Sequence, residues 1–143
     1  MPDDLASTNA NRAYSMAATS IAIFTFMLVF LFPRYESGQL DALLFQGALI
    51  VMGLATFASV LSSVHYYGAS LSSRLDEKKR AQYGRRADLL WSMGYSLLFF
   101  APVLILFAVG LVVVGAIWLA LWIAYIVFAL RNFPSLLTPP KTD

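Results

Sequence analysis

The sequence contains no cysteine, a single histidine and few charged residues. The missing cysteines exclude disulfides, thiolate catalysis and cysteine-ligated metals. His65 alone cannot supply both axial ligands of a b-type haem, and the sequence offers it no partner ligands for a metal site. We therefore expect no cofactor and no metal. Asp, Glu, Lys and Arg make up 13% of the chain, which is about half the share usual in soluble domains.

Charge is absent from three long stretches, which are residues 13–33, 42–73 and 89–130. An apolar helix of about 20 residues is long enough to cross the ~30 Å hydrocarbon core of a bilayer. The hydrophobic fraction is 59%, which is too high for a soluble domain of 143 residues. The stretches therefore predict membrane-spanning helices, and the length predicts a single transmembrane domain over residues 1–143.

The third stretch is long enough to hold two spans. As one helix it would measure about 63 Å, which is twice the thickness of the hydrocarbon core. Gly110 and Gly115 bracket the best place for a turn, because glycine tolerates positive φ. Pro33 is expected to end the first span, and Pro102 is a candidate kink in the third. The predicted spans are residues 13–32, 42–64, 89–109 and 114–130.

The distribution of Lys and Arg predicts the orientation of the spans. Four spans place both chain ends and the 65–88 connection on one side, which then carries every basic residue except Arg34. By the positive-inside rule, both termini are expected in the cytoplasm, with the protein in the plasma (inner) membrane. The predicted fold is all-α: an integral membrane four-helix bundle, N-in/C-in, with a basic cytoplasmic loop over 65–88 between helices 2 and 3 and a mobile tail over 132–143.

A polar stripe runs along the second predicted span. Its members follow alternating steps of four and three residues and share one helix face: Met52, Thr56, Ser59, Ser63, Tyr66, Ser70 and Ser73. In one interpretation, the hydroxyl groups from Thr56 to Ser70 line a narrow wet path. In the other, which the residue types favour, small hydroxylated residues let helices approach closely and form hydrogen bonds across the contact. Both hold if the stripe packs against its copies in an oligomer.

A second small-residue surface, the alanine ridge, consists of Ala116, Ala120 and Ala124 on the fourth predicted span. Trp118 and Trp122 fall on the opposite side of that helix. Because small residues allow close helix contacts, we expect the alanine ridge to face inward. The aromatic side chains are then expected to face lipid or a partner protein.

One strongly charged segment, residues 74–88, separates the second and third spans. Its basic residues are Arg74, Lys78, Lys79, Arg80, Arg85 and Arg86. Each could contribute about 1 kcal/mol of attraction to anionic lipid, which makes them candidate lipid-binding residues. Positive-inside topology alone also explains them and is favoured. The segment is too short to predict nucleic-acid binding, so the expected partner is the lipid bilayer.

The predicted spans contain no Asp, Glu, Lys or Arg, which argues against proton relays and ion-coupled carriers. The sequence also lacks a pair of acid and base residues of the kind that would indicate an enzyme. The leading hypothesis is a non-enzymatic, homo-oligomeric ion channel or pore-like transport protein. The alternative is an accessory or assembly subunit of a larger membrane complex, with no conduction of its own. A stripe facing water around a symmetry axis would favour the channel, whereas a stripe buried within one subunit would favour the accessory subunit.

Overall fold

The computed structural model describes residues 2–70 and 76–132, and these residues contain helices and no strand. The helices are α1 (Pro2–Phe26), the π-helical turn η1 (Met27–Leu31), α2 (Phe32–Glu36), α3 (Ala42–Ser70), α4 (Glu77–Ala108) and α5 (Val112–Asn132). Four stretches are long and apolar enough to cross a membrane: Ser7–Glu36, Ala42–Ser70, Lys79–Ala108 and Val112–Arg131. The all-helical fold class with four candidate spans is therefore confirmed, whereas the membrane orientation stays a prediction.

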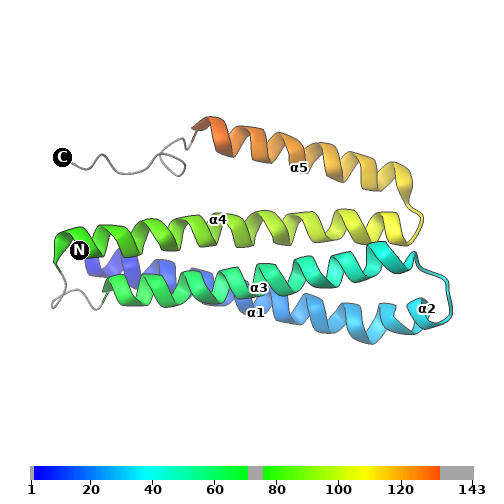
Figure 1. Cartoon of the computed structure of the whole chain (residues 1–143), viewed down its shortest axis with the longest axis horizontal. Helices are drawn as coiled ribbons and strands as arrows, with labels where there is room; N and C mark the ends of the chain where they lie inside the picture. Colours follow the sequence, from blue (N-terminus) through cyan, green and yellow to red (C-terminus); the bar gives the residue numbers. More distant parts are fainter. Residues whose placement is uncertain (1, 71–75, 133–143) are drawn as a thin grey trace.

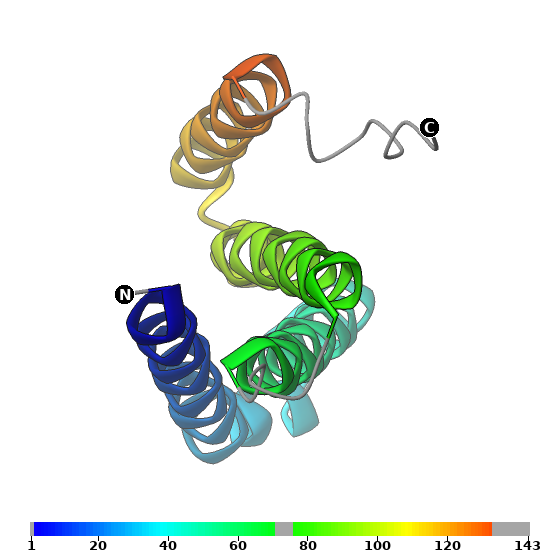
Figure 2. The same ribbon diagram turned by 90° about the vertical axis from the view of Figure 1, so that its left-hand side faces the viewer.

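The long helices run antiparallel to their neighbours in sequence (Figure 1). The beginning of α1, the end of α3, the beginning of α4 and the end of α5 lie at one end of the molecule, which we call the basic end. The segment α2 and the turn between α4 and α5 lie at the other end. Helix α3 packs against α1 and α4, while α5 packs chiefly against α4 and stands apart from α1 and α3 (Figure 2).

A glycine-centred cap forms the turn between α4 and α5. Gly110 has a φ of 82°, a left-handed conformation that glycine adopts without a Cβ clash. Its N–H donates to the carbonyl of Phe107 (3.0 Å), and the N–H of Leu111 donates to the carbonyl of Leu106 (2.8 Å). This pair of bonds satisfies the last carbonyls of α4 in a Schellman motif. A turn between the third and fourth predicted spans is therefore confirmed, and it is centred on Gly110. Gly115 lies outside the turn, because α5 already begins at Val112.

The helix of the first predicted span does not end at Pro33, as the sequence predicted. The chain stays helical through η1 and α2 as far as Glu36. Pro33 lies in the first turn of α2, where the missing proline N–H costs little, because a helix start leaves its first N–H groups without intrahelical partners. The π-helical turn that precedes α2 supplies the local change of winding that allows this start.

The basic segment between the second and third spans is mostly helical, not a loop over 65–88. Helix α3 continues to Ser70, and α4 already begins at Glu77. The start of α4 is rich in residues with high helix propensity. The negative charge of Glu77 in the first turn also stabilises the helix, because it lies at the positive end of the helix dipole. Lys79, Arg80, Arg85 and Arg86 therefore belong to a helix and not to a loop. Ser73 of the polar stripe, Arg74 and residues 133–143 of the predicted tail lie outside the described residues.

The core lies along α3 in three layers. The middle layer is Met27, Ala48, Met52 and Ala101; the layer near α2 is Leu40, Phe45 and Ala108; and the layer near the basic end is Ala13, Tyr66 and Ala87. Each layer combines residues of α3 and α4, and alanine recurs in all three. Alanine at a helix contact lets the backbones approach closely, so α3 and α4 form the tightest part of the fold.

Candidate functional site

The polar stripe of α3 is buried inside the chain. Ser59 is fully buried, and Ser63 and Tyr66 are 5% and 7% exposed. Thr56 and Ser70 are half-buried. Because α3 packs against α1 on one side and α4 on the other, the stripe faces protein in a single copy of the chain.

The serine and threonine hydroxyl groups of the stripe that lie within α3 are already hydrogen-bonded to the backbone of that helix. Their donors and backbone acceptors are Thr56 Oγ1 to Met52 (2.9 Å), Ser59 Oγ to Ala55 (2.7 Å), Ser63 Oγ to Val60 (3.0 Å) and Ser70 Oγ to Tyr67 (2.8 Å). Bonds to the preceding helical turn are common for these side chains. They satisfy the buried hydroxyl groups without water, and this suits a helix contact.

Small residues recur every seven positions on both sides of the α3–α4 contact. They are Ala48, Ala55, Ser62 and Ala69 on α3, and Ala87, Gly94, Ala101 and Ala108 on α4, all buried. A seven-residue period keeps one seam of a helix facing its partner in a left-handed coil. Across this seam Ser62 Oγ donates to the carbonyl of Ala87 (2.8 Å). We call the two sets together the small-residue seam.

The small-residue seam is tightest where Gly94 meets α3. A Cβ atom at Gly94 would lie 2.9 Å from Ser59 Oγ and 3.2 Å from the backbone oxygen of Ala55. Real Cβ atoms hardly ever approach another heavy atom within 3.0 Å. Sequence reasoning found Ser59 but missed Gly94 and the other α4 members of the seam. Their seven-residue spacing was the signal that could have found them.

The alanine ridge of α5 was expected to face the other helices, but in the structure it faces outward. Ala116, Ala120 and Ala124 are exposed. On the opposite face, Trp122 Nε1 donates to the carbonyl of Ser96 on α4 (3.0 Å). The prediction of an inward ridge is therefore wrong within the chain, because the Trp122 indole N–H finds a backbone acceptor on α4 and its ring packs against Phe100 of α4. The ridge is an uncovered surface.

A small polar pocket lies between α1, the last turns of α3 and the first half of α4. Its volume is about 230 Å³, and its lining residues are Asn9, Arg12, Tyr66, Asp88 and Trp91. The Tyr66 hydroxyl donates a hydrogen bond to the carboxylate of Asp88. Sequence reasoning singled out Tyr66 but missed Asp88 and Arg12. Both flank an uncharged stretch, and a charged residue at such a boundary is a sequence signal for a site at the membrane surface.

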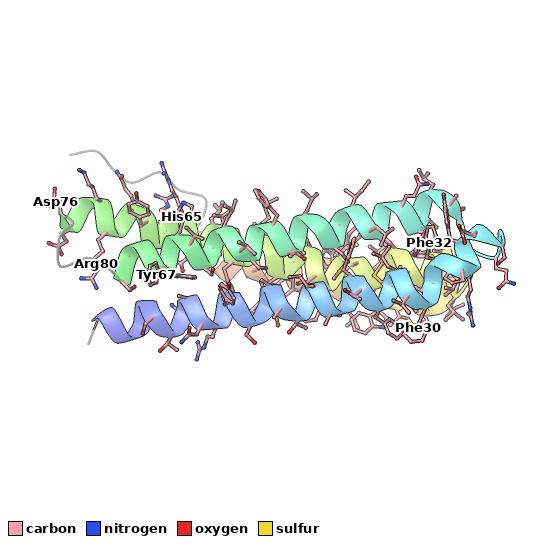
Figure 3. All side chains as sticks on the ribbon, turned by 90° about the horizontal axis from the view of Figure 1, so that it is seen from below. Phe30, Phe32, His65, Tyr67, Asp76 and Arg80 are labelled. Carbon is pink, nitrogen blue, oxygen red and sulfur yellow. The ribbon has the colours of Figure 1, made fainter. Side chains whose placement is uncertain are left out.

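The candidate lipid-binding residues that the structure describes lie on the first turns of α4. Lys79 and Arg86 are exposed, and Arg80 and Arg85 are partly exposed; Lys78 belongs to the same helix. Figure 3 shows Arg80 at the same end of the molecule as His65 and Tyr67, far from Phe30 and Phe32. The structure thus places these basic residues together at the start of α4, and lipid binding by them stays a prediction.

His65 is held by contacts within the protein. Its Nδ1 donates to the carbonyl of Leu61 (2.8 Å), and its ring centroid lies 5.9 Å from that of Tyr83. Within residues 2–70 and 76–132, no three His, Asp or Glu side chains are grouped so that they could hold a metal ion. The described geometry therefore assigns His65 to the α3–α4 contact.

Comparison with known proteins gives no relative from which to transfer a role. No protein-family model, no curated protein and no solved structure matches this chain. The fold itself defines the class, which is an all-helical protein with four helices able to cross a membrane. Any more specific function must be argued from the small-residue seam, the uncovered ridge and the polar pocket.

Proposed function

We propose that this chain is a non-enzymatic accessory or assembly subunit of a larger membrane complex, with no conduction of its own. The observation that carries this proposal is the burial of the polar stripe within one subunit. Ser59 and Ser63 face protein, and their hydroxyl groups bond to backbone carbonyls of α3. A pore-lining role needs hydroxyl groups that face water and can replace part of an ion's hydration shell.

A water path along the stripe would require α3 to separate from α4. The two helices are in close contact along the small-residue seam, from Ala48 opposite Ala101 to Ser62 opposite Ala87. Separation would break the Ser62–Ala87 hydrogen bond, which contributes about 1 kcal/mol. It would also remove the van der Waals contacts that hold membrane helices together. The seam therefore favours a rigid scaffold over a gated path.

The uncovered face of α5 is the surface on which a partner helix would pack. Helix α5 contacts chiefly α4, and Ala116, Ala120 and Ala124 are exposed at four-residue spacing. Small residues at this spacing permit close approach of a second membrane helix. The helix would come from another membrane subunit or from a second copy of this chain.

The proposal places the protein in the plasma (inner) membrane with the basic end in the cytoplasm. Arg12, Lys79 and Arg131 lie toward the ends of their candidate spans at the basic end, whereas Arg34 lies toward the opposite end of its span. Retention of basic residues on the cytoplasmic side supports this orientation.

The accessibility of introduced cysteines distinguishes the proposed accessory subunit from a homo-oligomeric channel. Single replacements Ser59→Cys and Ser63→Cys are expected to resist water-soluble thiol reagents in sealed vesicles, because both side chains are buried against protein. Gln82→Cys, at an exposed position of α4, is the labelling control. The purified chain in liposomes is expected to carry no ion flux under applied voltage. Labelled stripe cysteines together with a flux that Ser59→Leu reduces would favour the homo-oligomeric channel instead.

A further inference from the structure

Side chains of α1, α4 and α5 line an apolar groove. Figure 2 shows how these helices are arranged, with α4 between α1 and α5. The groove encloses about 480 Å³. Its lining includes Ile23 and Phe26 from α1, Phe99, Pro102 and Leu106 from α4, and Trp118 from α5. Every side chain that lines the groove is apolar, so it suits a hydrocarbon chain and no polar ligand.

The groove continues toward the basic end. A second hollow of about 270 Å³ shares Phe99 and Trp118 with it and adds Tyr95. The ring of Tyr95 stacks on that of Trp91, with centroids 5.2 Å apart, and Trp91 lines the polar pocket. Aromatic side chains thus connect the apolar groove to the polar pocket without a break.

The polar pocket and the apolar groove also lie on the same helix faces. The α4 positions are Asp88, Trp91, Tyr95, Phe99, Pro102 and Leu106, which follow steps of three and four residues. On α1, Arg12 lines the pocket and Ile23 lines the groove. The two residues are eleven positions apart, which is close to three helical turns. Positions at these spacings share one side of a helix. The combined surface is therefore polar at one end and apolar over the rest.

The length of this surface matches one leaflet of a bilayer. Asp88 and Pro102 are separated by about 21 Å along α4 at 1.5 Å per residue. One leaflet with its headgroups measures about 20–22 Å, which is half of a whole bilayer. A phospholipid with its headgroup beside Asp88 therefore extends its acyl chain to Pro102, where the groove is open.

The charges of the polar pocket select the headgroup. Arg12 provides a cation that suits a phosphate, and a guanidinium can bond two phosphate oxygens at once. Asp88 provides an acceptor for an ammonium, and the indole of Trp91 beside it attracts cations. A headgroup with a negative phosphate and a positive amine complements both charges, whereas a purely anionic headgroup meets repulsion from Asp88. A primary ammonium can also donate hydrogen bonds to the carboxylate, which a choline group cannot.

We propose that the polar pocket and the apolar groove together bind one phospholipid with an ethanolamine headgroup. Its phosphate lies at Arg12, its ammonium at Asp88, and an acyl chain runs past Tyr95 and Phe99 to Pro102. This site differs from the exposed basic residues at the start of α4, which would attract anionic lipid without selecting an amine. The proposal does not depend on whether the protein is an accessory subunit.

The chain carries its own probe for this site, because its three tryptophans, Trp91, Trp118 and Trp122, line the pocket or the groove. Bromine atoms on an acyl chain quench tryptophan fluorescence at short range. The full chain is placed in phosphatidylcholine bilayers with increasing fractions of acyl-brominated phosphatidylethanolamine, or of brominated phosphatidylglycerol or phosphatidylcholine. Half-maximal quenching is expected at a fraction of the ethanolamine lipid about five-fold lower than for the other two lipids. A five-fold difference is about the effect expected from one charge interaction at a membrane surface.

Two variants test the headgroup contacts. Asp88→Asn keeps an acceptor for the Tyr66 hydroxyl but loses the charge, so the ethanolamine preference should disappear. Arg12→Gln, at an exposed position, should weaken quenching by both phosphatidylethanolamine and phosphatidylglycerol. Glu36→Gln, at the other end of the molecule, is the matched control and should change neither.

Equal quenching by all three headgroups would overturn the proposal, because it would mean ordinary annular lipid. A preference for phosphatidylglycerol, or an ethanolamine preference retained in Asp88→Asn, would also overturn it. Should Asp88→Asn fail to fold, as judged by circular dichroism, Arg12→Gln decides: an unchanged quenching curve contradicts the site. Native mass spectrometry of the detergent-purified chain provides a second readout, in which the wild type should retain one ethanolamine lipid and Arg12→Gln should lose it.

Discussion

At the scale of single residues, the contact between Gly94 and Ser59 limits how the helices can pack. Ser59 bonds to its own helix, so its side chain presents a small, saturated surface to α4. Gly94 presents no side chain at all, and the backbone of Ala55 lies behind the contact. Membrane helices gain little from hydrophobic burial against each other, so close van der Waals contact of this kind provides much of their association energy.

Replacing Gly94 with alanine should therefore destabilise the protein. The new Cβ would meet Ser59 Oγ and the Ala55 oxygen, and overpacking of this kind lowers the free energy of unfolding by about 1–3 kcal/mol. The matched control is Gly53→Ala, where nothing lies within 4 Å of a new Cβ and the helix should gain up to about 1 kcal/mol. Unfolding in mixed micelles measures both changes. Similar stability of the two variants would mean that α3 and α4 shift apart without cost.

At the scale of helices, the sequence predicted the elements better than their faces. Uncharged runs located the long helices, and Gly110 located a turn because its φ of 82° suits glycine. Hydrophobicity could not tell which side of α5 faces protein, since lipid and protein interior are equally apolar. The small side chains of the alanine ridge predicted that this face of α5 packs against the other helices. The hydrogen bond from Trp122 to Ser96 instead holds the opposite face of α5 against α4. The pairing of Tyr66 with Asp88 depends on how α3 and α4 meet, and no local pattern encodes it.

The hydrogen bond from Trp122 predicts how α5 is held. Trp122→Phe keeps an aromatic ring near Phe100, whose centroid lies 4.7 Å from that of Trp122, but removes the donor to Ser96. The contact between α4 and α5 should weaken by about 1 kcal/mol. A disulfide trap between cysteines placed at Phe107 and Gly115, where α4 and α5 meet, should then form more slowly than in the parent. An unchanged rate would mean that ring packing alone holds α5.

At the scale of the whole molecule, the arrangement of the helices makes a prediction about topology. Ser37 lies at the α2 end and Gln82 at the basic end (Figure 1). Single cysteines at these positions should react with membrane-impermeant reagents from opposite sides, Ser37→Cys from outside the cell and Gln82→Cys from the cytoplasm, because basic residues stay inside. Labelling of both positions from one side would contradict the four-span arrangement, and labelling with the sides exchanged would contradict only the orientation.

The uncovered alanine ridge tests whether the chain works as part of an assembly. Ala120 is exposed in a single copy, so Ala120→Leu should leave the fold and its unfolding free energy unchanged. In a close contact with a partner helix, the same leucine would overpack the interface and weaken association by about 1–3 kcal/mol. Ala22→Leu, at an exposed position of α1, is the matched control. Crosslinking in native membranes should yield a complex with the parent and with Ala22→Leu, but much less with Ala120→Leu. Because folding is measured separately, equal crosslinking of all three chains would assign the ridge to lipid and would remove its support for the proposed assembly role.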